Sequence, residues 1–229
     1  MSVDEIIKAV RFCIDEESNN TSLLNDEKDD VYMDNIIKAK IPDALYWVGI
    51  LSPSQSLVMP NGSDDMFIKD YNTKEKTAEG LQYDSNWDKK NGIGCITFPK
   101  ENPIRLIRLR GDDWHKAIRE PYEEDSDESL YMYNASAKGT VERPIAVIVR
   151  GNPTRLLVQP NSNSFDLTFA RYVSMEGSSA EDDIQVPDSV RSSFTYYLSY
   201  LLLSAYDDSK ATQMYNIAVQ QLGIRTQNE

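Results

Sequence analysis

The sequence predicts an α+β protein: a helical bundle from the N- and C-terminal helices, with an inserted small antiparallel β region and an extended arm. Three observations support this fold class. Apolar residues recur every three or four positions at both ends of the chain, which is the spacing of a buried helix face. The middle of the chain carries short segments of β type, bounded by Gly, Pro and Asn. Residues 52–92 show neither pattern.

These patterns divide the chain into five parts. The two groups of helices are separated in sequence by the strands, yet each needs an apolar partner, so we expect them to pack together. The predicted parts are the N-terminal helices of the bundle (1–51), the arm or loop (52–92), the β region (93–175), the C-terminal helices of the bundle (186–223) and a tail (224–229).

The most strongly patterned segment covers residues 187–223. Its main apolar stripe is accompanied by a second apolar face, which contains Tyr196, Tyr200 and Leu203. Polar residues at 207–209 interrupt the pattern and predict two helices in a hairpin, or one helix bent there. Because the first helix is apolar on more than one face, we expect it to be covered partly by this chain and partly by a neighbouring subunit.

Two helices are predicted at the N-terminus. Ser2 and Glu5 have the spacing of a capping box, and an apolar stripe follows them, which indicates a helix over residues 3–17. A second helix is predicted over residues 31–50. Its spacing continues through Pro42, where the missing backbone donor should kink the helix.

The β region contains five predicted strands: Ile93–Phe98, Ile104–Arg110, 145–150, Thr154–Gln159 and Leu167–Val173. The pair Leu106-Ile107 breaks the alternation of the second strand and predicts a bulge. The turn at 151–153 joins the third and fourth strands as a hairpin. Residues 114–118 are expected to form a helical turn, and residues 120–129 an acidic loop.

Composition narrows the classes of partner. The chain has 229 residues and a formal net charge of −13, which disfavours general affinity for nucleic acid or anionic membrane. Cys13 and Cys95 share no metal or redox spacing and indicate buried thiols in a reducing compartment. The N-terminus lacks the pattern of a signal peptide, and no apolar run is long enough for a bilayer. We therefore expect a soluble protein made in the cytoplasm.

No catalytic, cofactor-binding or metal-binding residue is predicted. His115 is the only histidine, and it lies near Asp112 and Asp113, so these three residues form the one candidate cation site. An exposed turn is the more ordinary interpretation of them. The other acidic groups fall in predicted loops or at a helix break, where solvated charge or capping explains them: Asp64-Asp65, Asp182-Asp183, Asp207-Asp208 and Glu123–Glu128.

Six arginines lie on or beside the predicted strands of this acidic chain: Arg105, Arg108, Arg110, Arg143, Arg150 and Arg155. They form either a basic strip that receives an acidic partner surface, because Arg pairs with carboxylates through two hydrogen bonds, or a solvent face whose arginines pair with Glu142 and nearby acids. The sequence leaves both interpretations open.

Several segments together resemble the head–tail adaptor or ring proteins of short-tailed bacteriophages, most closely those of the crAss-like phages. The segments are EIIKAVRFCIDE, DNIIKAKIPDALYWV, ITFPKENPIRLIRLRGDDWHKAI, RPIAVIV and VPDSVRSSFTYYLSYLLLSAYDDSKATQMYNIAVQQLG. The resemblance covers most of the chain and is weakest at 52–90 and 120–140. It implies a homo-oligomeric ring, usually of twelve copies, beneath the portal. Such a ring contacts the portal and the next tail ring, and DNA passes through its lumen without specific binding.

The resemblance also implies a location in the virion tail at the portal vertex, after assembly in the host cytoplasm. We predict interfaces at Tyr196, Tyr200, Leu203, Arg105, Arg108, Arg110, Trp114, Ile224 and Arg225. One alternative is a different ring or hub protein of the same tail. Another, from a different class, is an acidic inhibitor that mimics DNA.

Overall fold

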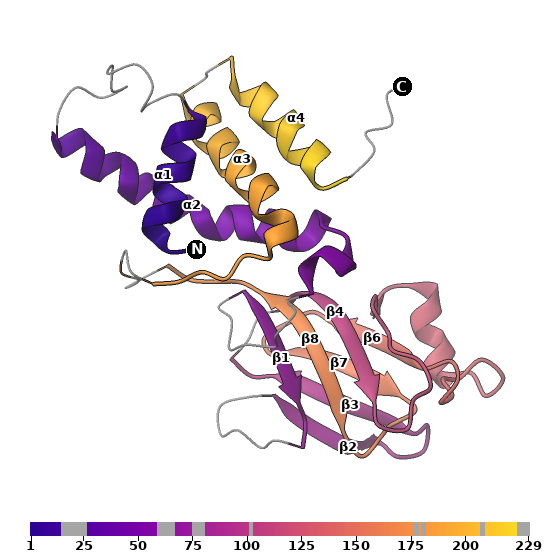
Figure 1. Cartoon of the computed structure of the whole chain (residues 1–229). Helices are drawn as coiled ribbons and strands as arrows, with labels where there is room; N and C mark the ends of the chain where they lie inside the picture. Colours follow the sequence, from indigo (N-terminus) through magenta and orange to yellow (C-terminus); the bar gives the residue numbers. More distant parts are fainter. Residues whose placement is uncertain are drawn as a thin grey trace, which may run out of the picture. The chain divides into compact units, whose positions relative to one another are not determined.

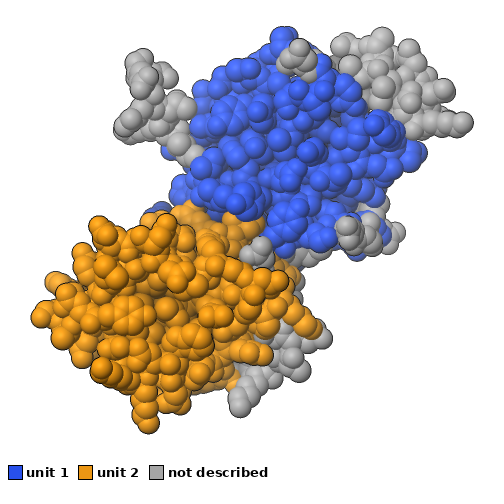
Figure 2. Space-filling view, turned by 180° about the vertical axis from the view of Figure 1, so that it is seen from behind, with its two compact units in different colours: residues 1–59, 65–67, 172–229 blue, residues 60–64, 68–171 orange. Residues whose placement is uncertain are grey.

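The structure is a computed structural model that describes residues 1–14, 27–58, 67–74, 81–100, 103–175, 179, 182–206 and 209–223, with the backbone alone at 27–30. The chain divides into two compact units, coloured separately in Figure 2. The first unit comprises residues 1–59, 65–67 and 172–229, and the second comprises residues 60–64 and 68–171. The second unit is therefore an insertion in the sequence of the first.

The first unit is helical (Figure 1). Its described helices are α1 (Val3–Cys13), α2 (Glu27–Leu51), the 3-10 helix η1 (Ser54–Leu57), α3 (Asp188–Ala205) and α4 (Ala211–Gln221). The predicted capping box is present, since Ser2 and Glu5 each accept a hydrogen bond from the other's backbone N–H. The N-terminal amine pairs with Asp183 at 2.7 Å, which ties the start of α1 to the segment before α3.

Helix α3 is the centre of this unit, because it packs against α1, α2 and α4. Phe194 and Leu198 of α3 are fully buried, as are Ile41 and Leu45 of α2. Each such side chain stabilises the fold by roughly 1.5–3 kcal/mol. The N- and C-terminal parts of the chain thus share one hydrophobic core.

The second unit is built from two sheets, which Figure 1 shows stacked against each other. The three-stranded sheet has the order β1 (Ile68–Asn72), β8 (Phe165–Arg171), β4 (Pro103–Gly111). The five-stranded sheet has the order β2 (Gln82–Asp88), β3 (Ile93–Phe98), β7 (Thr154–Gln159), β6 (Ile145–Val149), β5 (Tyr122–Glu123). All pairs are antiparallel except β5 and β6, which run parallel.

The core of this unit lies between the two sheets. Alternate residues of β4 and β8, such as Leu109 and Phe169, meet alternate residues of β3 and β7, such as Phe98 and Leu156, in one buried cluster. On the outer face of the five-stranded sheet, a smaller cluster contains Met132 of the 3-10 helix η2 (Asp127–Tyr133). Helix η2 therefore covers part of that outer face.

The predicted fold class is wrong. The protein is a mixed α/β protein with eight described strands in two sheets, which is more sheet than a helical bundle with a small β region. The predicted arm contains β1 and β2, and Phe67 and Ile68 within it are buried. Both strands lie at sheet edges, and most of their residues are polar. The sequence therefore shows no clear strand pattern there.

Several local predictions are confirmed. Helix α2 continues through Pro42, α3 and α4 are separate helices, β6 and β7 form the expected hairpin, and the register of β4 shifts at two places as a bulge requires. The bend at Pro42 stays a prediction. The helical turn at 114–118 is wrong, because Ile118 instead forms a β-bridge with Leu109. Helix α1 ends at Cys13, and residues 15–17 of its predicted end lie outside the described residues.

Candidate interaction surfaces

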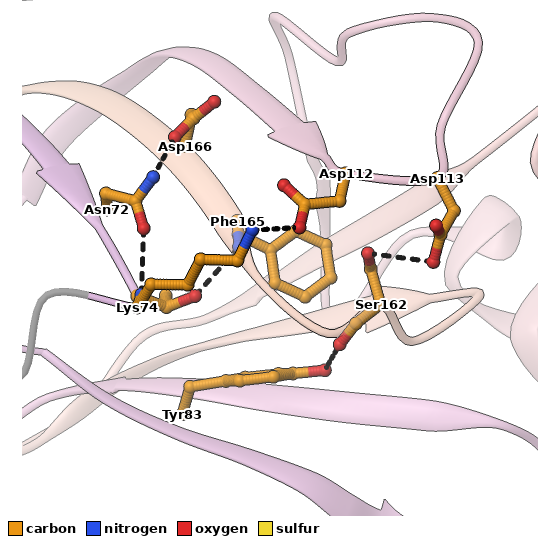
Figure 3. A network of polar contacts seen from close by, with 9 residues as sticks. Asn72, Lys74, Tyr83, Asp112, Asp113, Ser162, Phe165 and Asp166 are labelled. Carbon is orange, nitrogen blue, oxygen red and sulfur yellow. Dashed lines mark hydrogen bonds and ion pairs between the residues drawn. The ribbon is translucent and has the colours of Figure 1, made fainter.

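The candidate cation site at Asp112, Asp113 and His115 does not converge. The Nζ atom of Lys74 lies 2.5 Å from Oδ2 of Asp112, whereas Asp113 accepts a hydrogen bond from Ser162 Oγ at 3.3 Å (Figure 3). His115 is exposed beside them. In the part of the chain that the structure describes, no three side chains of His, Cys, Asp or Glu gather in a way that could hold a metal ion.

The contacts in Figure 3 have a structural use. The hydrogen bond from Lys74 lowers the pKa of the Asp112 carboxyl, and the same bond raises the pKa of Lys74. The Asn72 side chain donates to Asp166 at 2.5 Å and accepts from the backbone N–H of Lys74 at 2.8 Å. These contacts fasten the end of β1 to β8 and to the turn after β4.

The remaining acidic pairs are engaged or lie elsewhere. Asp183 pairs with the N-terminal amine, and Asp182 accepts from the backbone N–H of Ser179 at 2.5 Å. The pairs at 64–65 and 207–208 lie outside the described residues. An ion pair and a hydrogen bond within a turn therefore account for the described pair.

The second apolar face of α3 is covered mainly by this chain. Leu203 is 3% exposed and belongs to a cluster with Ile14 of the N-terminal segment and with Ala211 and Met214 of the following helix. Its prediction as an interface residue is wrong, because α4 folds back over it. Tyr196 and Tyr200 are half-buried against the same cluster, and their role at an interface stays a prediction.

An aromatic cluster joins three helices of this unit. Trp47 of α2 stacks on Tyr197 of α3 with ring centroids 4.0 Å apart, and Tyr200 and Tyr215 lie against Tyr197 at 5.4 and 6.3 Å. Burial raises the pKa of Tyr197. Tyr215 of α4 is exposed, so the cluster reaches the surface there.

Trp114 is a core residue. Its side chain is 2% exposed, its Nε1–H donates to the carbonyl oxygen of Pro160 at 3.0 Å, and its ring meets Phe165 edge-on. Gly111 makes room for it, since a Cβ there would lie 3.0 Å from the indole ring. Trp114 was predicted at an interface, and this prediction is wrong because the side chain fills the space between the sheets.

The six strand arginines do not form one strip. Arg155 projects from the outer face of the five-stranded sheet, over the ring of Trp87, whereas Arg108 and Arg110 project from the opposite sheet. Arg105 pairs with Glu120 at 3.0 Å, and Arg150 lies 3.5 Å from Glu123. The interpretation as ordinary paired arginines therefore holds for Arg105 and Arg150.

Four cations on and beside β4 are different, and we name them the basic group: Arg108, Arg110, Lys116 and Arg119. All four are exposed, and none has an ion-pair partner among the described residues. The bridge between Leu109 and Ile118 brings the segment of Lys116 and Arg119 alongside the strand of Arg108 and Arg110. Sequence reasoning identified only the two that belong to the strand.

A second exposed surface was missed. Leu130, Tyr131 and Tyr133 of η2 are 64%, 42% and 58% exposed. These three residues lie near four exposed acids: Glu124, Asp125, Asp127 and Glu128. We call the seven residues together the knob. Its signal in the sequence is the run LYMY directly after the acids, which the interpretation as an acidic loop overlooked.

Ile224 and Arg225, the last two predicted interface residues, lie outside the described residues. None of the described helices combines the length and the apolar character needed to cross a bilayer. Comparison of the chain with models of protein families gives no match, and comparison with curated proteins gives none either.

Proposed function

We propose that this chain is a structural subunit of a bacteriophage head–tail adaptor, a homo-oligomeric ring that joins the portal to the tail. The ring lines the channel through which DNA leaves the capsid, and it resides in the virion at the portal vertex. Its partners are further copies of itself, the portal protein and the next tail ring. The resemblance of the patterned segments to phage ring proteins is the starting point of this proposal.

The structural observation that supports it is that one small unit carries both the basic group and the knob on its surface. Arg and Tyr are enriched at the centres of protein interfaces, where they contribute most of the binding energy. In this chain of net charge −13, none of the four cations of the basic group forms an ion pair with a described residue, although Arg110 lies opposite Asp166 across the sheet. These features favour a protein whose work is binding other proteins.

The same observation separates this proposal from an inhibitor that mimics DNA. Such an inhibitor needs an array of carboxylates spaced like phosphates on one surface. The outer face of the three-stranded sheet instead carries Arg108 and Arg110 beside Asp70 and Asp166. Mixed charge of this kind does not imitate a phosphate backbone.

The negative charge of the chain suits a channel for DNA. Each cation in a lumen is a potential phosphate contact, and each such contact slows the passage of DNA. We therefore expect acidic side chains, and not the basic group, to line the lumen.

The proposal is tested by purifying the chain alone and together with its portal protein. Negative-stain images and sedimentation velocity should show closed rings in at least one of the two samples. A chain that stays monomeric in both samples, and that does not bind the portal, would contradict it.

A further inference from the structure

The knob is anchored by buried contacts to the outer face of the five-stranded sheet. Met132, within η2, is 1% exposed and packs on Ile93, Ile145 and Val147 of that face. The side chain of Gln159, also 1% exposed, donates to the carbonyl oxygen of Met132 at 3.0 Å. A surface that is fixed before binding loses little entropy on association, which favours a role in docking.

Gln159 also connects the knob to its surroundings. Its Nε2 donates to the carbonyl oxygen of Asn91 at 2.6 Å, and its Oε1 accepts from the backbone N–H of Gly139 at 2.8 Å. The hydroxyl groups of Ser126 and Ser129 bond to the carbonyl oxygens of Glu123 and Glu124. The acids therefore project from an ordered backbone.

The knob and the basic group are chemically complementary. The knob presents four acids, none of which is ion-paired to another described residue, together with two tyrosines and a leucine. The basic group presents three arginines and a lysine, with Asp70 and Asp166 beside Arg108 and Arg110 on the outer face of the three-stranded sheet. Arginine binds carboxylates through two hydrogen bonds and stacks on aromatic rings, so it can satisfy both components of the knob.

Arg108 and Arg110 lie on the face of the unit opposite to the knob of the same chain. The knob lies on the outer face of the five-stranded sheet, whereas Arg108 and Arg110 lie on the outer face of the three-stranded sheet, with the core of the unit between them. Two complementary surfaces on opposite faces of one unit produce a head-to-tail contact between copies. Such a contact repeats, and it gives a ring when the rotation between copies closes.

We propose that the knob of one copy docks on the basic group of the next copy, and that this contact builds the oligomer. The inference rests on the proposed function in that it identifies the contact between subunits of the ring. The proposed binding partner of the basic group is therefore a second copy of this chain and not nucleic acid.

Charge reversal tests the contact. The first variant carries Arg108→Glu and Arg110→Glu, and the second carries Glu124→Lys and Glu128→Lys. All four side chains are exposed and lack ion pairs with described residues, so both variants should keep the circular dichroism of the parent chain. Arg110→Glu places a second carboxylate opposite Asp166 and should lower the melting temperature of the first variant slightly. A matched control carries Lys89→Glu and Lys90→Glu, which lie in the exposed turn between β2 and β3.

Self-association is measured by sedimentation velocity, for the chain alone and with the portal protein. Each reversal should weaken it by about a hundredfold or more, whereas the control should assemble like the parent. An equimolar mixture of the two reversed chains should assemble again, because each knob then meets a face of opposite charge. An uncharged variant with Leu130→Ser and Tyr133→Ser should also lose self-association.

The outcomes that would overturn the inference are distinct from those that affect the proposed function. Rings that persist in the Arg108→Glu, Arg110→Glu variant would overturn this contact but would agree with the proposal that the chain forms a ring. A folded pair of reversed chains that does not assemble on mixing would do the same. A parent chain that stays monomeric in both samples and does not bind the portal would overturn the contact and the proposed function together.

Discussion

The indole of Trp47 lies flat on the ring of Tyr197, with centroids 4.0 Å apart and planes 7° from parallel. This contact joins α2, near the N-terminus, to α3, near the C-terminus, although the whole sheet-containing unit separates them in sequence. The two ends of the chain are therefore fastened through aromatic packing as well as through aliphatic side chains.

Replacement of Trp47 by Ala should destabilise the helical unit by about 2–3 kcal/mol, because it removes a large half-buried ring and the stacking of that ring on Tyr197. Urea denaturation followed by far-UV circular dichroism measures the change. Tyr46→Ala, at the exposed neighbouring position, is the control and should cost about 0.5 kcal/mol or less. Equal losses in the two variants would show that the stacking is unimportant.

Gly139 should not tolerate a side chain. A Cβ at this position would lie 2.3 Å from the backbone oxygen of Gln159, so the backbone itself would have to move. Gly139→Ala should therefore lower the free energy of unfolding by about 3 kcal/mol. Gly151→Ala, whose Cβ would meet nothing closer than 3.8 Å, should leave stability nearly unchanged in the same denaturation experiment.

The pKa of Asp112 should depend on Lys74. The hydrogen bond from Lys74 lowers the pKa of this carboxyl in the folded protein, so the bond stabilises the fold above the pKa of the unfolded chain. That contribution is lost as the pH falls through the folded-state pKa. Lys74→Met should raise the pKa of Asp112 toward its ordinary value, which NMR titration of the carboxyl carbon measures. An unchanged pKa in this variant would show that the pair does not form.

Gln159 should support the knob. Gln159→Leu leaves the N–H of Gly139 and the carbonyl oxygens of Asn91 and Met132 buried without their partner. We expect a loss of about 2–4 kcal/mol in stability, and amide hydrogen exchange should become faster in η2. Gln82→Leu, at an exposed position of β2, provides the control. Unchanged exchange in η2 would mean that packing of Met132 alone holds the knob.

The helices were predictable because their apolar residues repeat at helical spacing, and the hairpin of β6 and β7 because two β-rich runs flank a short turn. The fold class was not. Strand β2, with the sequence QYDSNWD, is a polar edge strand that pairs on one side only, and β5 contains two residues. Neither carries enough apolar residues to indicate a strand, so the size of the β region was underestimated.

The surfaces were predictable only in part. Arg108 and Arg110 stood out by their position in an acidic chain, but Arg119 joins them through a bridge that no local pattern indicates. Trp114 was assigned to an interface because the sequence cannot show that Gly111, three residues earlier, leaves space for its ring in the core. Both errors concern contacts between segments, which depend on the assembled sheets.

A reconstruction of the portal vertex of the virion that contains this chain tests the central proposal most directly. The proposal predicts a ring of identical subunits between the portal and the next tail ring, each fitting the two units described above. It further predicts that η2 of each subunit lies against Arg108 and Arg110 of its neighbour. A vertex in which no density fits this chain would contradict the proposed function.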